Sequence, residues 1–159
     1  MKRTIFGLIA TIALICTAPG FAAEEWPGVK FAEVRAYAWP DDGKHVEEDV
    51  ILKDMALKEG VINKDGAELS TEQVKTLLAA VTGKHPEYGV AACYMPHNAF
   101  VFYDADKKPV AFVEICFDCR GLRVMPNGAT KPVDLVALAT IFKELKLPTG
   151  SKSELPAAK

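Results

Sequence analysis

The chain has 159 residues, of which 50% are hydrophobic and 25% are charged, and its formal net charge is −2. This length suits one domain with a hydrophobic core, and the composition excludes an intrinsically disordered chain. The mild negative charge and the lack of a basic stripe exclude nucleic acid and anionic membranes as expected partners.

The N-terminus has the pattern of a secretory signal peptide. Lys2 and Arg3 precede an apolar run that ends at Pro19-Gly20 and is short for a membrane span. The small residues Ala22-Ala23 then supply a cleavage site. We expect residues 1–23 to be a cleaved signal, which makes the mature protein periplasmic or secreted, with no stable membrane anchor after cleavage.

The expected mature chain contains an odd number of cysteines. The sequence has four, and Cys16 lies within the apolar part of the signal. An odd count in an exported protein leaves at least one thiol unpaired, metal-bound or bonded to another chain. We expect residues 24–150 to form a single α+β domain and residues 151–159 to form a flexible tail.

The first half of the expected domain contains one strand and one helix. Residues 29–39 are rich in β-branched and aromatic side chains and end at a turn, which predicts a strand. Residues 44–62 fit either short strands or helical turns, and their structure stays undetermined. Ser70 and Gln73 form a capping box, which predicts a helix over about 71–82.

The second half predicts a hairpin at the centre of the domain. A strand begins near residue 89 and continues, after Pro96, to residue 103; the turn 104–108 then leads into a strand over 110–116. The hairpin spans about 99–116, and residues 122–125 would add a further short strand.

A second helix is expected over about 131–146. Thr130 is the expected N-cap, and Leu147-Pro148 follows the helix. The order of elements predicts an α+β fold, in which an antiparallel sheet with this central hairpin carries both helices on it.

The candidate functional site consists of four residues in two short clusters: Cys93, His97, Cys116 and Cys119. With the hairpin turn centred near Asp106, Cys93 falls opposite Cys119, and His97 falls opposite Ile115, beside Cys116. Opposed residues in such a pair lie within reach of a disulfide or of a shared metal ligand set. The hairpin is therefore expected to bring both clusters together at its open end.

Three interpretations of this cluster stay open. The first is a disulfide among Cys93, Cys116 and Cys119 with one spare thiol, and Cys93–Cys119 is its specific cross-strand form. The second is a closed metal site, in which all four residues bind zinc or copper(I).

The third interpretation is a thiol–disulfide redox centre at Cys116 and Cys119. The sequence after Cys119, Arg120-Gly121-Leu122, does not favour a helix, whereas thioredoxin-like centres open one. Whether the chain is an enzyme is undecided at this point.

The stretch from Cys93 to Cys119 resembles a family of uncharacterised small exported bacterial proteins. The shared features are Cys-x-x-Pro-(Arg/His) at Cys93–His97, Phe-Tyr-Asp at 102–104, Cys-Phe-x-Cys at Cys116–Cys119, and a final helix that ends near Leu-Pro. The resemblance implies export and similar boundaries, and it implies no activity.

The sequence therefore predicts a small exported protein, most simply a binding protein stabilised by a disulfide or a metal ion. A periplasmic thiol–disulfide redox protein using Cys116 and Cys119 is the alternative. The ligand, the partner and the oligomeric state do not follow from the sequence.

Overall fold

The computed structural model describes residues 26–41, 49–87, 89, 93–129 and 132–150. The predicted signal peptide, the tail at 151–159 and residues 90–92 of a predicted strand lie outside the described residues.

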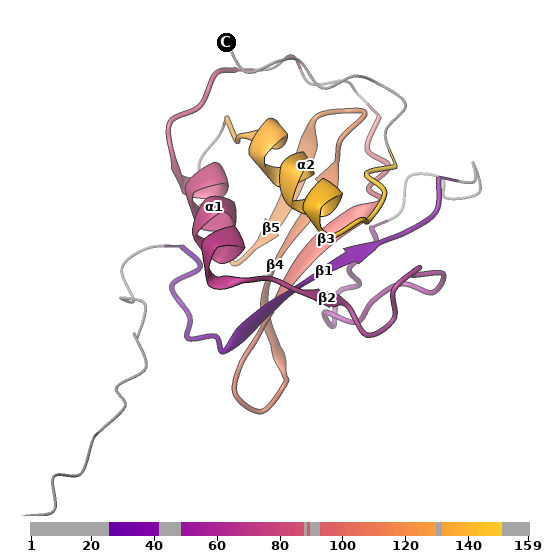
Figure 1. Cartoon of the computed structure of the whole chain (residues 1–159), viewed down its shortest axis with the longest axis vertical. Helices are drawn as coiled ribbons and strands as arrows, with labels where there is room; N and C mark the ends of the chain where they lie inside the picture. The colour runs from indigo at the N-terminus through magenta and orange to yellow at the C-terminus, as the bar shows by residue number, and fades with distance from the viewer. Residues whose placement is uncertain (1–25, 42–48, 88, 90–92, 130–131, 151–159) are drawn as a thin grey trace, which may run out of the picture.

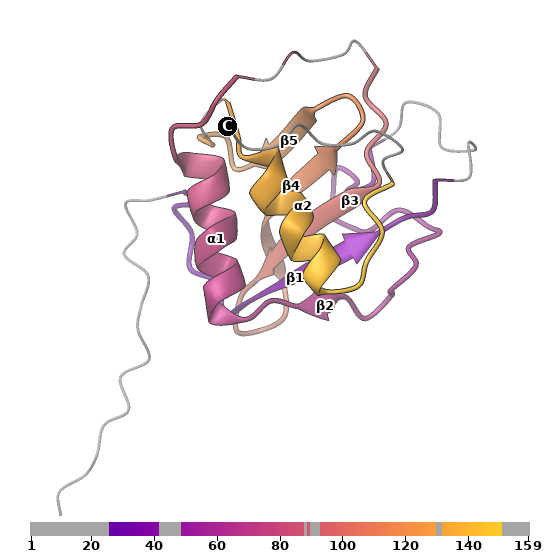
Figure 2. The same ribbon diagram turned by 45° about the horizontal axis from the view of Figure 1, so that its top comes forward.

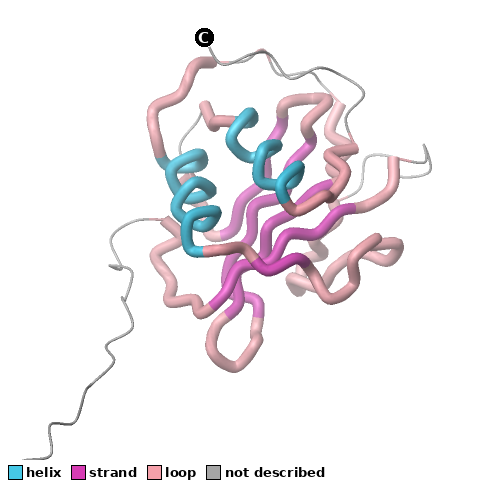
Figure 3. The backbone as a smooth tube through the Cα atoms, in the orientation of Figure 1, coloured by secondary structure: helices cyan, strands magenta, loops and turns pink. Residues whose placement is uncertain are grey.

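Five strands form one sheet in the order β2-β1-β3-β4-β5, and each neighbouring pair is antiparallel. Figure 3 shows the strands in magenta and the helices in cyan. The strands are β1 (Glu33–Ala38), β2 (Ala67–Glu68), β3 (Asn98–Tyr103), β4 (Pro109–Cys116) and β5 (Gly121–Met125). The β3–β4 hairpin lies at the centre of the sheet, as the sequence predicts.

Both helices, α1 (Thr71–Thr82) and α2 (Leu135–Glu144), cover the same face of the sheet (Figures 1 and 2). The core on this face includes Phe100 and Phe102 of β3, Leu77 of α1, and Leu138 and Phe142 of α2. The predicted α+β fold is confirmed.

Helix α1 forms where its local sequence predicts it. Gln73 donates its backbone N–H to Ser70 Oγ (3.3 Å), and Ser70 donates its own to Gln73 Oε1 (3.0 Å), which completes a capping box. Val74, Leu77 and Val81 are buried on one side of the helix. Capping and burial act together, so the predicted bounds of this helix are confirmed.

Helix α2 is shorter than the predicted segment. It begins at Leu135, and Asp134 is its N-cap, with Asp134 Oδ1 accepting the backbone N–H of Ala137 at 2.9 Å. Thr130 lies outside the described residues and is not the N-cap. An aspartate satisfies the free N–H groups of a first turn as well as threonine does, so composition alone does not place the start.

The second face of the sheet is also covered. Tyr37, Trp39, Ala99, Val101 and Phe112 form a core on this face with Val50 and Ile51. Residues 51 and 57 form an isolated antiparallel bridge. The segment whose structure the sequence left undetermined is thus, in its described part, a looped cover over this face.

The hairpin register differs by one residue from the prediction. Asn98, and not His97, lies opposite Ile115, and the register shifts between Phe102 and Tyr103. A bulge next to the turn adds one residue to one strand and moves every later pair. Strand β3 also begins only at Asn98, so Cys93 lies outside the ladder.

Candidate functional site

The Cys116–Cys119 pair closes the turn between β4 and β5. The two residues form a disulfide, and their Cα atoms are 5.6 Å apart. Cys119 also donates its backbone N–H to Cys116 Sγ (3.3 Å), and Arg120 donates to the Phe117 carbonyl (3.3 Å). Arg120 has a φ of 54°, the left-handed conformation that turns the chain into β5 at Gly121.

Both bonded cysteines are buried. Cys116 is 1% exposed and Cys119 is 0% exposed, and Phe117 between them packs edge-on against Phe142 at a centroid distance of 5.9 Å. Exchange of a disulfide requires a thiolate to reach a sulfur atom. In this arrangement the protein itself covers both sulfur-bearing residues.

The structure pairs Cys119 with Cys116 and not with Cys93. Cys93 is an exposed free cysteine, outside strand β3. The expected cross-strand pairing of Cys93 with Cys119 depended on a β3 strand that continues upstream to residue 93. Because β3 begins at Asn98, that pairing is not formed, and the disulfide joins the two nearest cysteines in the chain.

His97 precedes strand β3 and lies against the segment that follows α2. It is buried, and its carbonyl accepts the backbone N–H of Trp39 (2.8 Å). A Cβ added at Gly150 would lie 2.6 Å from His97 Cβ and 2.8 Å from Cγ, so the imidazole packs against the segment that follows α2.

The four candidate ligands are not gathered into one site. In the part of the chain that the structure describes, no three His, Cys, Asp or Glu side chains lie close enough to hold a metal ion. Cys116 and Cys119 cannot act as thiolate ligands while they are bonded to each other. A zinc or copper(I) site at Cys93, His97, Cys116 and Cys119 stays a prediction that applies only to a reduced protein.

Tyr94 connects the disulfide turn to the covered second face. A Cβ added at Gly121 would lie 2.9 Å from Tyr94 Cδ2 and 3.9 Å from Cys119 Sγ, so the ring and the disulfide both flank this glycine. Tyr94 Oη donates to Glu114 Oε1 (2.9 Å). Burial, and then the charge of Glu114 and the hydrogen bond to it, raise the pKa of the Tyr94 phenol.

Glu114 is a fully buried carboxylate at the centre of a polar cluster on the second face. Oε1 accepts from Tyr94 Oη and from Arg123 Nε (3.0 Å). Oε2 accepts from the backbone N–H of Ile51 (2.7 Å) and from Arg123 Nη2 (2.8 Å). Four donors therefore compensate the loss of water around this carboxylate.

Arg123 lies directly across the β4–β5 ladder from Glu114. It also forms an ion pair with Asp49 (3.3 Å), donates to the Ile51 carbonyl and stacks on Phe112 at 4.8 Å from the ring centroid. Burial acts to lower the pKa of Arg123, but its hydrogen bonds and charge interactions with Glu114 raise the pKa overall. Arg123 therefore faces Glu114 as a guanidinium cation.

Sequence reasoning missed this cluster. One signal was present: Glu114 is the single charged residue in an otherwise apolar strand, and Arg123 is the single charged residue in the next one. Opposite charges on neighbouring strands favour a cross-strand pair. The roles of Tyr94 and Ile51 required the three-dimensional fold.

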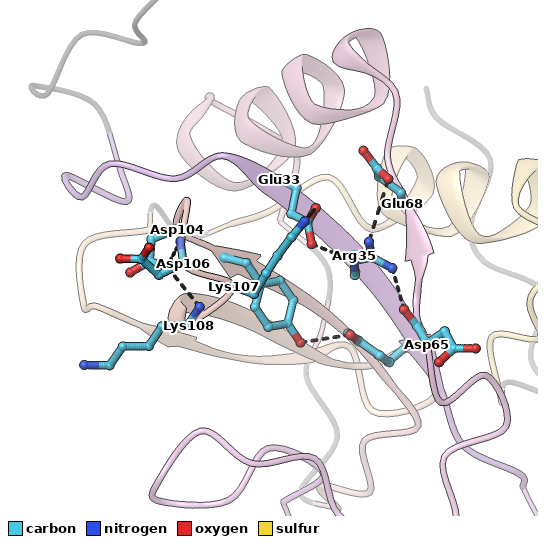
Figure 4. A network of polar contacts seen from close by, with 10 residues as sticks. Glu33, Arg35, Asp65, Glu68, Asp104, Asp106, Lys107 and Lys108 are labelled. Carbon is cyan, nitrogen blue, oxygen red and sulfur yellow. Dashed lines mark hydrogen bonds and ion pairs between the residues drawn. The ribbon is translucent and has the colours of Figure 1, made fainter.

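A second polar network lies around β1 and the turn between β3 and β4 (Figure 4). Arg35 donates to Glu33 (2.7 Å) and to the Asp65 carbonyl (2.6 Å), and Lys107 pairs with Glu33. The hydrogen bonds from Arg35 and then from Lys107 lower the pKa of Glu33. This network joins the hairpin turn to β1 through ion pairs at the surface, which contribute little to the free energy of unfolding.

A groove of about 700 Å³ runs along the outer side of α2. Its walls come from α2 and from residues 146–149. A smaller hollow of about 170 Å³ lies between β1 and the start of α1. Only the larger one falls in the range of about 300–1,000 Å³ that is typical of small-molecule sites.

Comparisons with known proteins identify no relative. No family model, no curated protein and no solved structure matches the chain. Of the described helices, neither has the length and apolar character needed to cross a bilayer.

Proposed function

We propose that this protein is a small exported binding protein and that its Cys116–Cys119 disulfide is a structural crosslink. The observation that carries the structural role is the burial of both cysteines, at 1% and 0% exposure. Export is supported by the signal-like N-terminus and by the Cys93–Cys119 sequence pattern that resembles small exported bacterial proteins.

The disulfide stabilises the turn that follows the central hairpin. It closes a loop of four residues, which removes unfolded-state entropy worth about 2 kcal/mol in the chain-entropy model. The crosslink also keeps Phe117 directed into the helix-side core, where it contacts Phe142. The disulfide therefore fixes the conformation of the turn between β4 and β5.

A thiol–disulfide redox role for Cys116 and Cys119 is the second candidate. One observation favours it: the exposed Cys93 precedes Tyr94, whose ring flanks Gly121 beside Cys119 Sγ. Against it, strand β5 begins at Gly121, so no helix N-terminus follows the cysteines to lower a thiol pKa.

The experiment combines a redox titration with unfolding of cysteine variants. A structural bridge equilibrated with glutathione should have a reduction potential below about −300 mV. The double variant Cys116→Ser/Cys119→Ser should lose about 2 kcal/mol of unfolding free energy in urea. The matched control Cys93→Ser should unfold as the wild type does, because that side chain is exposed and unpaired.

A redox enzyme would give a different pattern. Its potential would lie near or above about −200 mV, and the protein would reduce a disulfide-bonded test peptide in repeated turnovers. Loss of that turnover in the Cys93→Ser variant, with no loss of stability, would replace the structural proposal with the redox one.

A further inference from the structure

The groove on α2 combines an apolar half with a cationic half. The lining residues of α2 are Val136, Ala139, Thr140 and Lys143. These positions are spaced three, four and seven residues apart, so they follow one side of the helix. The apolar positions lie towards the start of α2 and the lysine lies in its last turn, about 10 Å further along the axis.

The facing wall is held in place by two backbone hydrogen bonds and one from a side chain. Lys146 has a φ of 58°, and its N–H donates to the Lys143 carbonyl (3.0 Å). Leu147 donates to the Phe142 carbonyl (2.9 Å), and Asn98 Nδ2 donates to the Pro148 carbonyl (2.8 Å). The groove is therefore formed before any ligand arrives, which lowers the entropic cost of binding.

The charge of the groove is opposite to that of the protein. The formal net charge of the chain is −2, but the lining contains Lys143 and Lys146 and no acidic side chain. Both lysines are exposed, and neither forms an ion pair with any described residue. The nearby Glu144 instead accepts from Gln73 Nε2 (3.0 Å).

A purely structural explanation of these lysines exists. Cations near a helix C-terminus interact favourably with the helix dipole. That explanation accounts for Lys143, and it leaves unexplained why apolar Val136, Ala139, Leu147 and Pro148 line the same groove.

We propose that this groove binds a free single-chain carboxylate of medium length, such as decanoate. The carboxylate pairs with Lys143 and Lys146, and the alkyl chain lies over Val136, Ala139 and Leu147. This inference rests on the proposed binding role and names its ligand class. Each methylene added within the groove should strengthen binding roughly fourfold, until the apolar half is filled.

The test is an NMR titration of the oxidised full-length protein with decanoate below its micelle concentration. We expect decanoate to shift the backbone amides of residues 136–149 in a saturable way. Octanoate, with two fewer methylenes, should bind roughly fifteenfold more weakly. Three controls should bind at least tenfold more weakly than decanoate. Acetate has only the carboxylate head, decyl maltoside has the alkyl chain without a charge, and decyltrimethylammonium has the alkyl chain with the opposite charge.

Variants separate the groove from its structural explanation. Lys143→Gln/Lys146→Gln should weaken decanoate binding at least tenfold and abolish the preference for decanoate over decyl maltoside. Ala139→Glu should block binding by filling the apolar half with a like charge. Lys108→Gln, an exposed lysine in the hairpin turn, is the matched control and should bind as the wild type does.

Four results would overturn the inference. The first two are shifts that do not map to residues 136–149, and equal binding of decanoate, decyl maltoside and decyltrimethylammonium. The third is unchanged binding by the double lysine variant. The fourth is a dimer in sedimentation that decanoate does not bind and whose amide shifts on dilution map to α2. Tighter groove binding by an acidic amphipathic peptide than by decanoate would likewise replace the proposed ligand. These outcomes leave the cysteine experiment untouched, so failure of this inference and failure of the structural disulfide are observed separately.

Discussion

At the scale of single residues, Glu114 is a fully buried side chain whose polar atoms are all hydrogen-bonded. Its two carboxylate oxygens accept four hydrogen bonds, which come from Tyr94, Arg123 and the backbone of Ile51. A buried charge with all its partners in place can be neutral for stability, whereas removal of one partner is costly. If Glu114 were replaced by a neutral residue, Arg123 would keep its charge and would lose the buried carboxylate that compensates it.

Glu114→Gln should therefore lower the unfolding free energy by about 2–4 kcal/mol, although the side-chain shape is kept. Chemical unfolding in urea measures this loss. Glu68→Gln is the control, because Glu68 is exposed and its contact with Arg35 is long, at 3.8 Å. A loss of under about 0.5 kcal/mol at Glu114, similar to the control, would mean that the network contributes nothing to stability.

The tyrosines predict an alkaline limit to stability. Burial raises the pKa of Tyr37, and its hydrogen bond with Tyr103 (2.8 Å) adds to this; burial and Glu114 raise that of Tyr94. Both folded-state pKa values lie above the unfolded value of about 10. The stability that they contribute is complete below about pH 10 and is lost as the pH rises further, because the unfolded chain then releases protons that the folded protein keeps.

The measurement is the urea midpoint as a function of pH from neutral to strongly alkaline. Tyr94→Phe should lower stability by about 1 kcal/mol at neutral pH and should flatten the alkaline decline, since one of the two phenols is gone. An unchanged slope in Tyr94→Phe would mean that Tyr94 does not take part in the alkaline transition.

At the scale of elements, the two helices show how far local sequence determines structure. The capping box of α1 is complete within four residues, so its start follows from the sequence alone. The start of α2 is ambiguous in the same terms, because Thr130 and Asp134 are both acceptable caps. The structure selects Asp134, whose backbone N–H also donates to the Ala80 carbonyl of α1 (2.9 Å). A contact between helices thus fixes what local chemistry leaves open.

Asp134→Ala should reduce stability by about 1 kcal/mol, because it leaves the N–H of Ala137 without its acceptor. Thr130→Ala is the matched comparison and should change stability by less than about 0.5 kcal/mol. Thermal or urea unfolding of both variants decides between the two caps. A larger loss at Thr130 than at Asp134 would contradict the position of the cap.

The hairpin shows which structural features its sequence did not predict. Strand composition located β3, β4 and their turn, but the expected register was one residue off because of the shift between Phe102 and Tyr103. Bulges depend on backbone conformation more than on composition, so a count from the turn does not reveal them. The expected pairing of Cys93 with Cys119 failed for a separate reason, because β3 begins only at Asn98 and does not reach residue 93.

At the scale of the whole molecule, the sheet is buried on both faces. Helices cover one face, and residues of the 49–61 segment cover the other with Val50, Ile51 and Met55. The two helices that cover the first face could be predicted from the sequence, because the helical periodicity of their apolar residues is strong. The irregular cover has no periodicity of its own, and its position follows from tertiary contacts such as those with Trp39, Glu114 and Arg123.

Strand β3 should be the most protected part of the backbone. It is the central strand, bonded to β1 and β4, and residues 99–102 are all 0% exposed. Hydrogen exchange should show the slowest amides there, with exchange limited by global unfolding. Amides of the 51–58 cover should exchange faster through local opening. Faster exchange in β3 than in the cover would show that the sheet is not the stable centre of the fold.

Trp26 makes contacts that span almost the whole described chain. Its indole N–H donates to the Pro126 carbonyl (2.8 Å), and its ring packs edge-on against Phe102 at 5.4 Å. A ribosome delivers Trp26 first and Pro126 a hundred residues later. During synthesis this indole cannot reach its native acceptor until β5 has emerged, and non-local closure of this kind slows folding. The contact that ties the start of the described chain to the end of β5 can therefore form only late in synthesis.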